Sequence, residues 1–272
     1  MALDTLLTDP WWTAEALPDE GCAVWQLGRL SLYARRMGPD LAIGSRLDDE
    51  ELSHAVVGSL SSVPEDITAW PRWVTGVEQP RLRLLPVLPS LPVVIRPYQP
   101  ITLGPHMKVR IYVGLPCLLQ VAVLGADHEA ARTLLEIESV PLSQTWFGEP
   151  VAGELALSLR SRARRHLGDI DHLAHRILCP VEISNQHHGD FSFERAFVRL
   201  AHCGVYHGAD RLFSSAIHLN YRGPEHEVEM EVENHPPAEA ATALLLQAPR
   251  NPSGVKGSRG VLAGLRGAWM TL

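Results

Sequence analysis

The 272 residues carry a formal charge of −7 and are 46% hydrophobic. A chain of this length buries a sizeable core in one large or two ordinary domains, and its apolar fraction excludes general disorder. Nucleic-acid-binding proteins need a positive balance, so we expect no nucleic-acid partner.

The N-terminal segment and the cysteines both indicate a cytoplasmic protein. Residues 1–12 carry two aspartates where a signal peptide needs bases, and no apolar run reaches the length of a transmembrane helix. The cysteines lie far apart with no CxxC pair, as is usual in a reducing compartment. We therefore expect a cytoplasmic chain with no direct membrane span.

The chain divides by composition into four predicted segments. These are an N-terminal extension at 1–21, an N-terminal β-rich lobe at 22–140, a C-terminal β-sandwich-like lobe at 141–250 and a basic glycine-rich tail at 251–272. Short apolar runs punctuated by turn residues recur through both lobes, a pattern typical of sandwiches. We predict a mainly β, sandwich-like fold with a few short helices.

In the N-terminal lobe, strand-like runs at 22–27 and 30–36 are followed by a turn at 38–40. The acidic residues 47–51 are predicted to form a loop. The segment 64–79 is predicted to be a connection that its tryptophans hold against the body of the lobe.

In the C-terminal lobe, Val228, Met230 and Val232 alternate with glutamates, which predicts an amphipathic strand at a solvated sheet edge. Residues 181–183 and 191–200 are predicted to form a hairpin around a polar turn. Three segments are the best helix candidates: 126–138, 160–175 and 239–247.

Seven segments resemble parts of a known family. They are Leu91 to Pro97, Ile101 to Pro105, Ile111 to Pro116, Leu142 to Pro150, Gly153 to Arg164, Cys179 to Asn185 and Ala248 to Arg250. On these residues the chain resembles, over 22–250, the bacterial and archaeal family called domain of unknown function 432. The resemblance implies no activity, cofactor or catalytic residue. It does imply a cytosolic partner of a membrane protein, such as a small mechanosensitive channel.

The segment Thr145 to Gly148 is the most distinctive of these. We interpret its two aromatic residues as a buried anchor before a turn, because buried aromatic side chains usually pack. The alternative is an aromatic platform for a ligand or partner, followed by arginines that suit phosphate or carboxylate. On that alternative the candidate contacts are Trp146, Phe147, Arg160 and Arg162. A solvated strand end is the competing interpretation of the arginines.

Ten of the thirteen histidines lie between 166 and 235. They are His166, His172, His175, His187, His188, His202, His207, His218, His226 and His235. Their spacing matches no zinc signature, and the nucleophile-elbow and phosphate-loop motifs of enzymes are missing. We expect no metal site, no cofactor and no catalytic residue. The alternative is a metal-dependent enzyme or small-molecule sensor that uses these histidines.

The tail after Arg250 has five glycines and no acidic residue. Apolar and basic side chains near its end fall at roughly helical spacing, which favours a docking element at the end of a flexible linker. The predicted docking residues are Leu262, Leu265, Arg266 and Trp269. We expect a non-enzymatic interaction or accessory protein that binds a protein partner or associates with itself.

Overall fold

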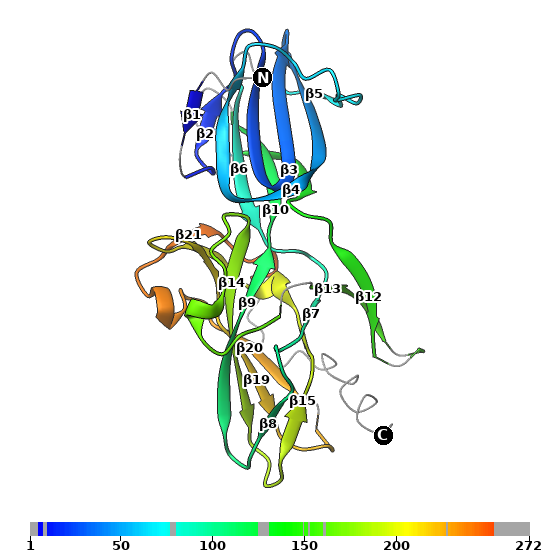
Figure 1. The fold of residues 1–272 in the computed structure, drawn as a ribbon, viewed down its shortest axis with the longest axis vertical. Helices are drawn as coiled ribbons and strands as arrows, with labels where there is room; N and C mark the ends of the chain where they lie inside the picture. Colours follow the sequence, from blue (N-terminus) through cyan, green and yellow to red (C-terminus); the bar gives the residue numbers. More distant parts are fainter. Residues whose placement is uncertain are drawn as a thin grey trace. The chain divides into compact units, whose positions relative to one another are not determined.

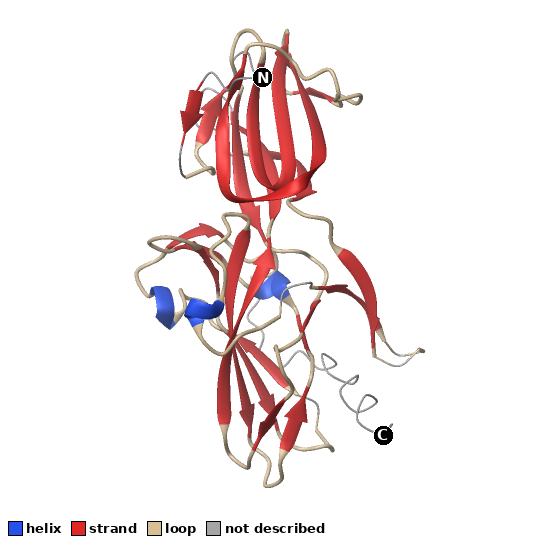
Figure 2. Ribbon diagram, in the orientation of Figure 1, coloured by secondary structure: helices blue, strands red, loops and turns tan. Residues whose placement is uncertain are grey.

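The computed structural model describes residues 5–7, 10–76, 80–124, 131–148, 150–151, 153–159, 162–226 and 228–252. Almost all regular structure in these residues is strand, which confirms the mainly β prediction (Figure 2). Arg160 and the four tail residues predicted to dock lie outside the described residues. Within the described ranges, no helix is long and apolar enough to cross a membrane.

The chain folds into two compact units. Unit 1 takes its described residues from 1–87, 116–141 and 173–175, and unit 2 takes them from the intervening segments and the C-terminal part, 88–115, 142–172 and 176–272. The chain therefore passes between the units several times, whereas its composition predicts one change of lobe near residue 140.

Unit 1, in its described part, contains two antiparallel sheets. One has the order β1-β4-β3 with β5 beside β4, and the other has the order β11-β10-β6-β2. The bounds are β1 Thr5–Leu7, β2 Ala14–Ala16, β3 Cys22–Met37, β4 Asp40–Leu60, β5 Arg72–Val74, β6 Arg81–Val87, β10 Leu118–Leu124 and β11 Arg132–Glu138.

Strands β3 and β4 form one long hairpin that curls around the interior of unit 1 (Figure 1). The predicted break at Gly28 is an irregularity inside β3, where the register shifts and Gly28 adopts a φ of 63°. The loop predicted at 47–51 is wrong, because β4 continues through it. Asp49, Glu50 and Glu51 are exposed on the strand, and the half-buried Asp48 accepts a 2.7 Å hydrogen bond from Nε of Arg46.

The connection after β4 packs against the sheet as predicted. Trp70 donates a 3.0 Å hydrogen bond from its indole nitrogen to the carbonyl of Ile67, and the guanidinium of Arg35 lies 4.7 Å from its ring centroid. The lack of a side chain at Gly44 permits this approach, since a β-carbon there would lie 2.6 Å from Cγ2 of Ile67. Ile67 and Trp70 thus close over a core that includes buried Tyr33.

Unit 2, where described, contains a four-stranded sheet of order β12-β13-β7-β16 and a two-stranded pair, β15-β8. Its seven-stranded sheet follows β20-β19-β14-β18-β17-β21, with β9 also paired to β14. The bounds are β7 Val93–Ile95, β8 Ile101–Leu103, β9 Lys108–Pro116, β12 Ser143–Phe147, β13 Glu154–Ser158, β14 Arg176–Asn185, β15 Phe191–Phe193, β16 Ala196–Val198, β17 Val205–His207, β18 Leu212–Ser214, β19 Ile217–Tyr221, β20 Glu229–Val232 and β21 Leu244–Gln247. Short 3-10 helices lie at η1 Leu167–Asp169, η2 Leu200–His202 and η3 Ala238–Ala240.

The helix predictions are wrong in their described parts. Residues 132–138 form β11, residues 244–247 form β21, and the candidate at 160–175 contains only the single turn η1. Both strands pair with a neighbour along their length, and cross-strand pairing of this kind overrides local helix propensity.

The hairpin predicted around 185–190 is also wrong. β15 pairs with the distant β8, while β14 pairs in parallel with β18 and β19. The amphipathic strand prediction is confirmed, because β20 lies at a sheet edge with Met230 fully buried and Glu231 exposed.

Candidate anion-binding site

One face of the four-stranded sheet of unit 2 carries two stacked phenylalanines flanked by arginines. Phe147 on β12 and Phe197 on β16 are both buried, and their ring centroids lie 4.9 Å apart. Arg195 and Arg199 flank β16, two positions before and two positions after Phe197. The guanidinium carbon of Arg195 lies 5.8 Å from the Phe147 centroid, and that of Arg199 lies 5.4 Å from the Phe197 centroid.

The same face fixes two of its arginines through neighbouring strands. Arg199 pairs with Glu154 of β13 in a bidentate contact, with nitrogen–oxygen distances of 2.7 and 2.6 Å. Arg96, two positions beyond Val94 of β7, donates a 2.9 Å hydrogen bond to Oγ of Ser158. The charge of Arg199 is therefore neutralised within the sheet, whereas Arg96 is held by a neutral hydroxyl.

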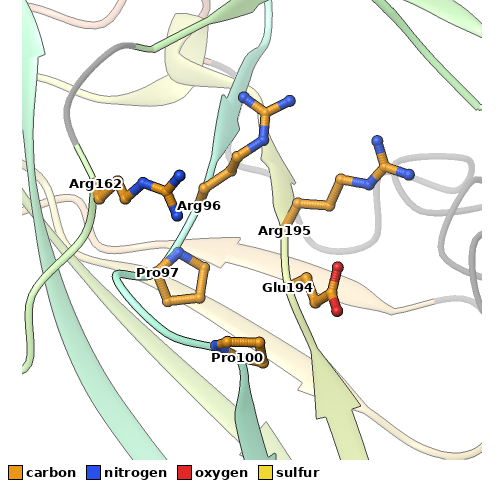
Figure 3. A pocket seen from close by; sticks show the side chains of 6 residues that line it. All are labelled: Arg96, Pro97, Pro100, Arg162, Glu194 and Arg195. Atoms are coloured by element: carbon orange, nitrogen blue, oxygen red, sulfur yellow. The ribbon is translucent and has the colours of Figure 1, made fainter.

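A pocket of about 430 Å³ opens beside Arg96 (Figure 3). It is lined by Arg96, Pro97, Pro100, Arg162, Glu194 and Arg195. These residues come from three segments: the link between β7 and β8, the chain before β14, and the turn between β15 and β16. In Figure 3 Arg96 stands between Arg162 and Arg195.

Backbone hydrogen bonds position the segment that carries Arg162. The amide of Ala163 donates to the carbonyl of Arg96 at 2.8 Å, and its carbonyl accepts from the amide of Tyr98 at 2.9 Å. Arg164 and Tyr112 exchange two further backbone hydrogen bonds of 2.8 Å. Arg162 therefore projects from a segment fixed on both sides by neighbouring chain.

Among the described residues that line it, the pocket has an excess of positive charge, with three arginines and the one carboxylate of Glu194. Neither Arg162 nor Arg195 forms an ion pair with another residue in the described part of the chain. Guanidinium groups offer a planar fork of N–H donors that suits carboxylate and phosphate oxygens. The lining is therefore chemically suited to an anionic group.

Of the aromatic pair predicted as an anchor, only Phe147 is buried. Trp146 is 53% exposed, and its cross-strand neighbour Leu155 is 40% exposed. Alternation along β12 puts Phe147 on the packed face and Trp146 on the opposite one. The buried-anchor interpretation is thus wrong for Trp146 and right for Phe147, whose ring lies inside the unit.

Among the predicted arginines, the structure places Arg162 in the pocket. Arg96 and Arg195 were not predicted, because they lie far from Arg162 along the chain. Strand β7, which precedes Arg96, pairs with β16, which follows Arg195, and no local spacing in the sequence encodes this pairing.

The comparisons with known proteins give a family and no function. The family described as "Protein of unknown function (DUF432)" matches residues 11–263. The chain belongs to this family. No curated protein and no solved structure matches it.

All four cysteines of this DUF432 protein are buried and unpaired. Burial raises the pKa of the Cys117 thiol to about 12, and it does the same for Cys179. Because the thiolate is the reactive form, these side chains are packing residues rather than nucleophiles at neutral pH.

The histidines that the structure describes lie mostly in separate environments. His175 is fully buried and lies 2.9 Å from a carboxylate oxygen of Glu51, while His218 lies 2.9 Å from Glu233. Among the residues described, no three histidine, cysteine or acidic side chains are grouped to hold a metal ion.

A second charged cluster on the DUF432 fold is internally satisfied. Arg110 of β9 donates to both carboxylate oxygens of Glu239 at 2.8 and 3.0 Å, and the Tyr112 hydroxyl adds a hydrogen bond of 2.8 Å. Burial opposes ionisation of Glu239, but the hydrogen bonds from Arg110 and Tyr112 outweigh it and lower the pKa of the carboxyl. This cluster holds η3 against β9 and leaves no charge for a ligand.

Proposed function

We propose that this protein is a non-enzymatic binding protein that accepts an anionic group, carboxylate or phosphate, in the arginine pocket of unit 2. The observation that carries the proposal is the meeting of three arginines with one carboxylate in a single pocket. Like charges in one small volume repel, so an anion that enters the pocket lowers the electrostatic energy of the folded protein.

A comparison of the pocket arginines with the neighbouring Arg199 supports this proposal. It stands on the same sheet face but has its own bidentate carboxylate, Glu154. Arg199 is thus neutralised, whereas no ion pair with Arg162 or Arg195 forms among the residues that the structure describes.

The size and lining of the pocket also support binding. A volume of about 430 Å³ falls in the range of small-molecule sites. The two prolines give rigid apolar walls, and the described lining residues include neither an imidazole nor a thiol for acid–base or nucleophilic chemistry.

Calorimetric titration of the full-length protein with inorganic phosphate and with citrate tests the proposal. We expect saturable binding of at least one of the two anions. Arg162→Ala and Arg195→Ala should each weaken it about tenfold or more, since a hydrogen bond to a charged group contributes roughly 1.5–3 kcal/mol. Arg165→Ala is the matched control, an exposed arginine of the same unit outside the lining.

Two results would contradict the proposal. One is the absence of saturable binding of either anion to the wild-type protein. The other is equal affinity in wild type, Arg162→Ala and Arg195→Ala, because the anion would then bind elsewhere.

A second candidate function is self-association through the edge strand β12. Trp146 and Leu155 are directly opposed on β12 and β13 and keep 53% and 40% of their surfaces exposed. Tryptophan is enriched at the energetic centres of protein interfaces, and an edge strand offers backbone groups for pairing. Sedimentation velocity should show a dimer in wild type that Trp146→Ser weakens, whereas a monomeric wild type would refute this candidate.

A further inference from the structure

Two loops of unit 2 that are far apart in sequence are joined by the buried side chain of Asn185. Its amide nitrogen lies 3.0 Å from the carbonyl oxygens of both Leu103 and Gly104 and 2.8 Å from that of Gly189. The Asn185 backbone amide adds a 2.8 Å hydrogen bond to the carbonyl of Met107. The β8–β9 turn and the β14–β15 loop are therefore held as one rigid end of the unit.

Each of these loops presents an exposed histidine to the other. Nε2 of His106, in the β8–β9 turn, lies 3.3 Å from Nδ1 of His188, in the β14–β15 loop. The two ring centroids are 5.1 Å apart, and the rings are inclined at 78°. The two residues are separated by 82 positions in the chain, so no local sequence spacing predicts the pair.

The backbone at His106 is held in an unfavourable conformation. Its φ is 57°, and it is the one residue other than glycine with a positive φ among those described. The left-handed region costs energy for a residue with a β-carbon, and such strain persists where the surrounding structure enforces it and often marks functional sites. This residue is the one whose imidazole lies against His188.

The nitrogen–nitrogen distance matches shared coordination of one metal ion. Zinc binds imidazole nitrogen at about 2.0–2.1 Å, and two such bonds at the tetrahedral angle put the nitrogens about 3.3 Å apart. We propose that His106 and His188 form a binding site for a divalent transition-metal ion that prefers imidazole, zinc first and copper second. Both side chains are exposed, so an ion reaches them directly from solvent.

The site has two protein ligands, which agrees with the finding that no group of three is arranged for a metal within the described residues. Water or an added ligand completes the coordination, as in open metal sites. The same two loops bring Asp190 and Met107 to Gly104, where Asp190 Oδ1 and Met107 Cγ lie 4.0 and 3.8 Å from the position that a β-carbon would take. The pair shares no residue with the arginine pocket, so a negative result for the metal site leaves the anion-binding proposal unaffected, and the reverse also holds.

Zinc titration of the metal-free, full-length protein by calorimetry tests the site. We expect one zinc ion per chain at this site, with affinity reduced at least tenfold in His106→Asn and in His188→Asn. Asparagine tolerates the left-handed conformation, so His106→Asn removes the imidazole while keeping the turn. His172→Ala is the matched control, because His172 is an exposed histidine of the same unit away from the pair.

A second measurement guards against a folding artefact. Electron paramagnetic resonance of bound Cu²⁺ should show coupling to two imidazole nitrogens in wild type and in His172→Ala, and a changed spectrum in both pair variants. Zinc affinity and copper spectra unchanged in both pair variants would overturn the proposal. Absence of saturable zinc binding to wild type would overturn it equally, and the contact would then be a hydrogen bond between two imidazoles.

Discussion

Two arginines of unit 1 are paired with carboxylates, whereas the described lining of the arginine pocket in unit 2 has more positive than negative side chains. In unit 1, Arg36 pairs with Asp19 at 2.8 Å, and Arg46 contacts both Asp48 and Asp66. Among the described residues that line the pocket of unit 2, three are arginines and one, Glu194, is acidic. A surface that matches its own charges serves solubility and local order, whereas a pocket that leaves cations unmatched is suited to recruit an anion.

The largest expected effect concerns the interior of unit 1. Gly28 and Gly38 have φ values of 63° and 64°, but a β-carbon at Gly28 would lie 2.9 Å from the Ser139 carbonyl oxygen, while nothing lies within 4 Å at Gly38. Gly38→Ala should therefore cost about 1–2 kcal/mol from backbone strain alone. Gly28→Ala should cost roughly 1–3 kcal/mol more, because a neighbour must also move.

Chemical denaturation of the two glycine variants checks this difference. Equal unfolding free energies would mean that the irregularity in β3 does not press against residue 139.

The next prediction concerns the hydrogen-bonded cluster of Arg110, Tyr112 and Glu239 in unit 2. It tests how the contribution of Glu239 to stability depends on pH. Because the folded-state pKa of Glu239 is lowered from 4.5, its contribution to stability is complete above pH 4.5 and is lost as the pH falls through the lowered value. Glu239→Gln should cost about 1–2 kcal/mol at neutral pH. At acid pH, the difference in unfolding free energy between Glu239→Gln and wild type should disappear.

Urea denaturation of wild type and Glu239→Gln at neutral and acid pH measures that gap, with the exposed Glu231→Gln as the control. A gap that stays constant across the pH range would show that the ionised carboxylate of Glu239 does not stabilise the fold.

A smaller effect separates the two kinds of arginine on the four-stranded sheet. Arg199→Ala should cost about 1 kcal/mol, since it removes a partly exposed bidentate pair and leaves Glu154 unmatched. Arg195→Ala should leave the melting temperature nearly unchanged, because no carboxylate pairs with it in the described part of the chain. Thermal melts of both variants measure this, and a greater loss in Arg195→Ala would assign the pocket arginine a structural role.

The smallest effect belongs to the surface of unit 1. Arg36 and Asp19 form an exposed pair, and exposed pairs contribute about 0–1 kcal/mol. Arg36→Ala should lower the unfolding free energy by less than about 0.5 kcal/mol. A loss above 2 kcal/mol, measured by denaturation, would mean that unit 1 depends on its matched charges.

Most of the correct fold predictions came from local sequence patterns. Alternation predicted the edge strand around Met230, and turn residues predicted the reversal at Gly38. The same patterns failed where partners are distant: residues 132–138 look helical in isolation, but pairing with β10 makes them a strand. The acidic run 47–51 looks like a loop because its sequence does not reveal that β3 continues beside it.

The candidate site was predictable only in part, for the same reason. Arg162 was a candidate contact on the alternative interpretation, because several arginines follow one another there, and it lines the pocket. Arg96 and Arg195 reach the pocket through the pairing of β7 with β16, which is not encoded in any local spacing. Trp146 was misassigned because the choice of face on an edge strand depends on which neighbour stacks, and Phe147 stacks on Phe197.

The most direct test of the central claim is a calorimetric phosphate titration of wild type and the double variant Arg162→Gln/Arg195→Gln. Glutamine keeps much of the arginine length and removes the charge, and neither arginine has an ion-pair partner to lose in the described part of the chain. We predict saturable binding to wild type and none to the double variant, with similar melting temperatures in the absence of phosphate. Equal phosphate affinity in both proteins would contradict the assignment of the pocket.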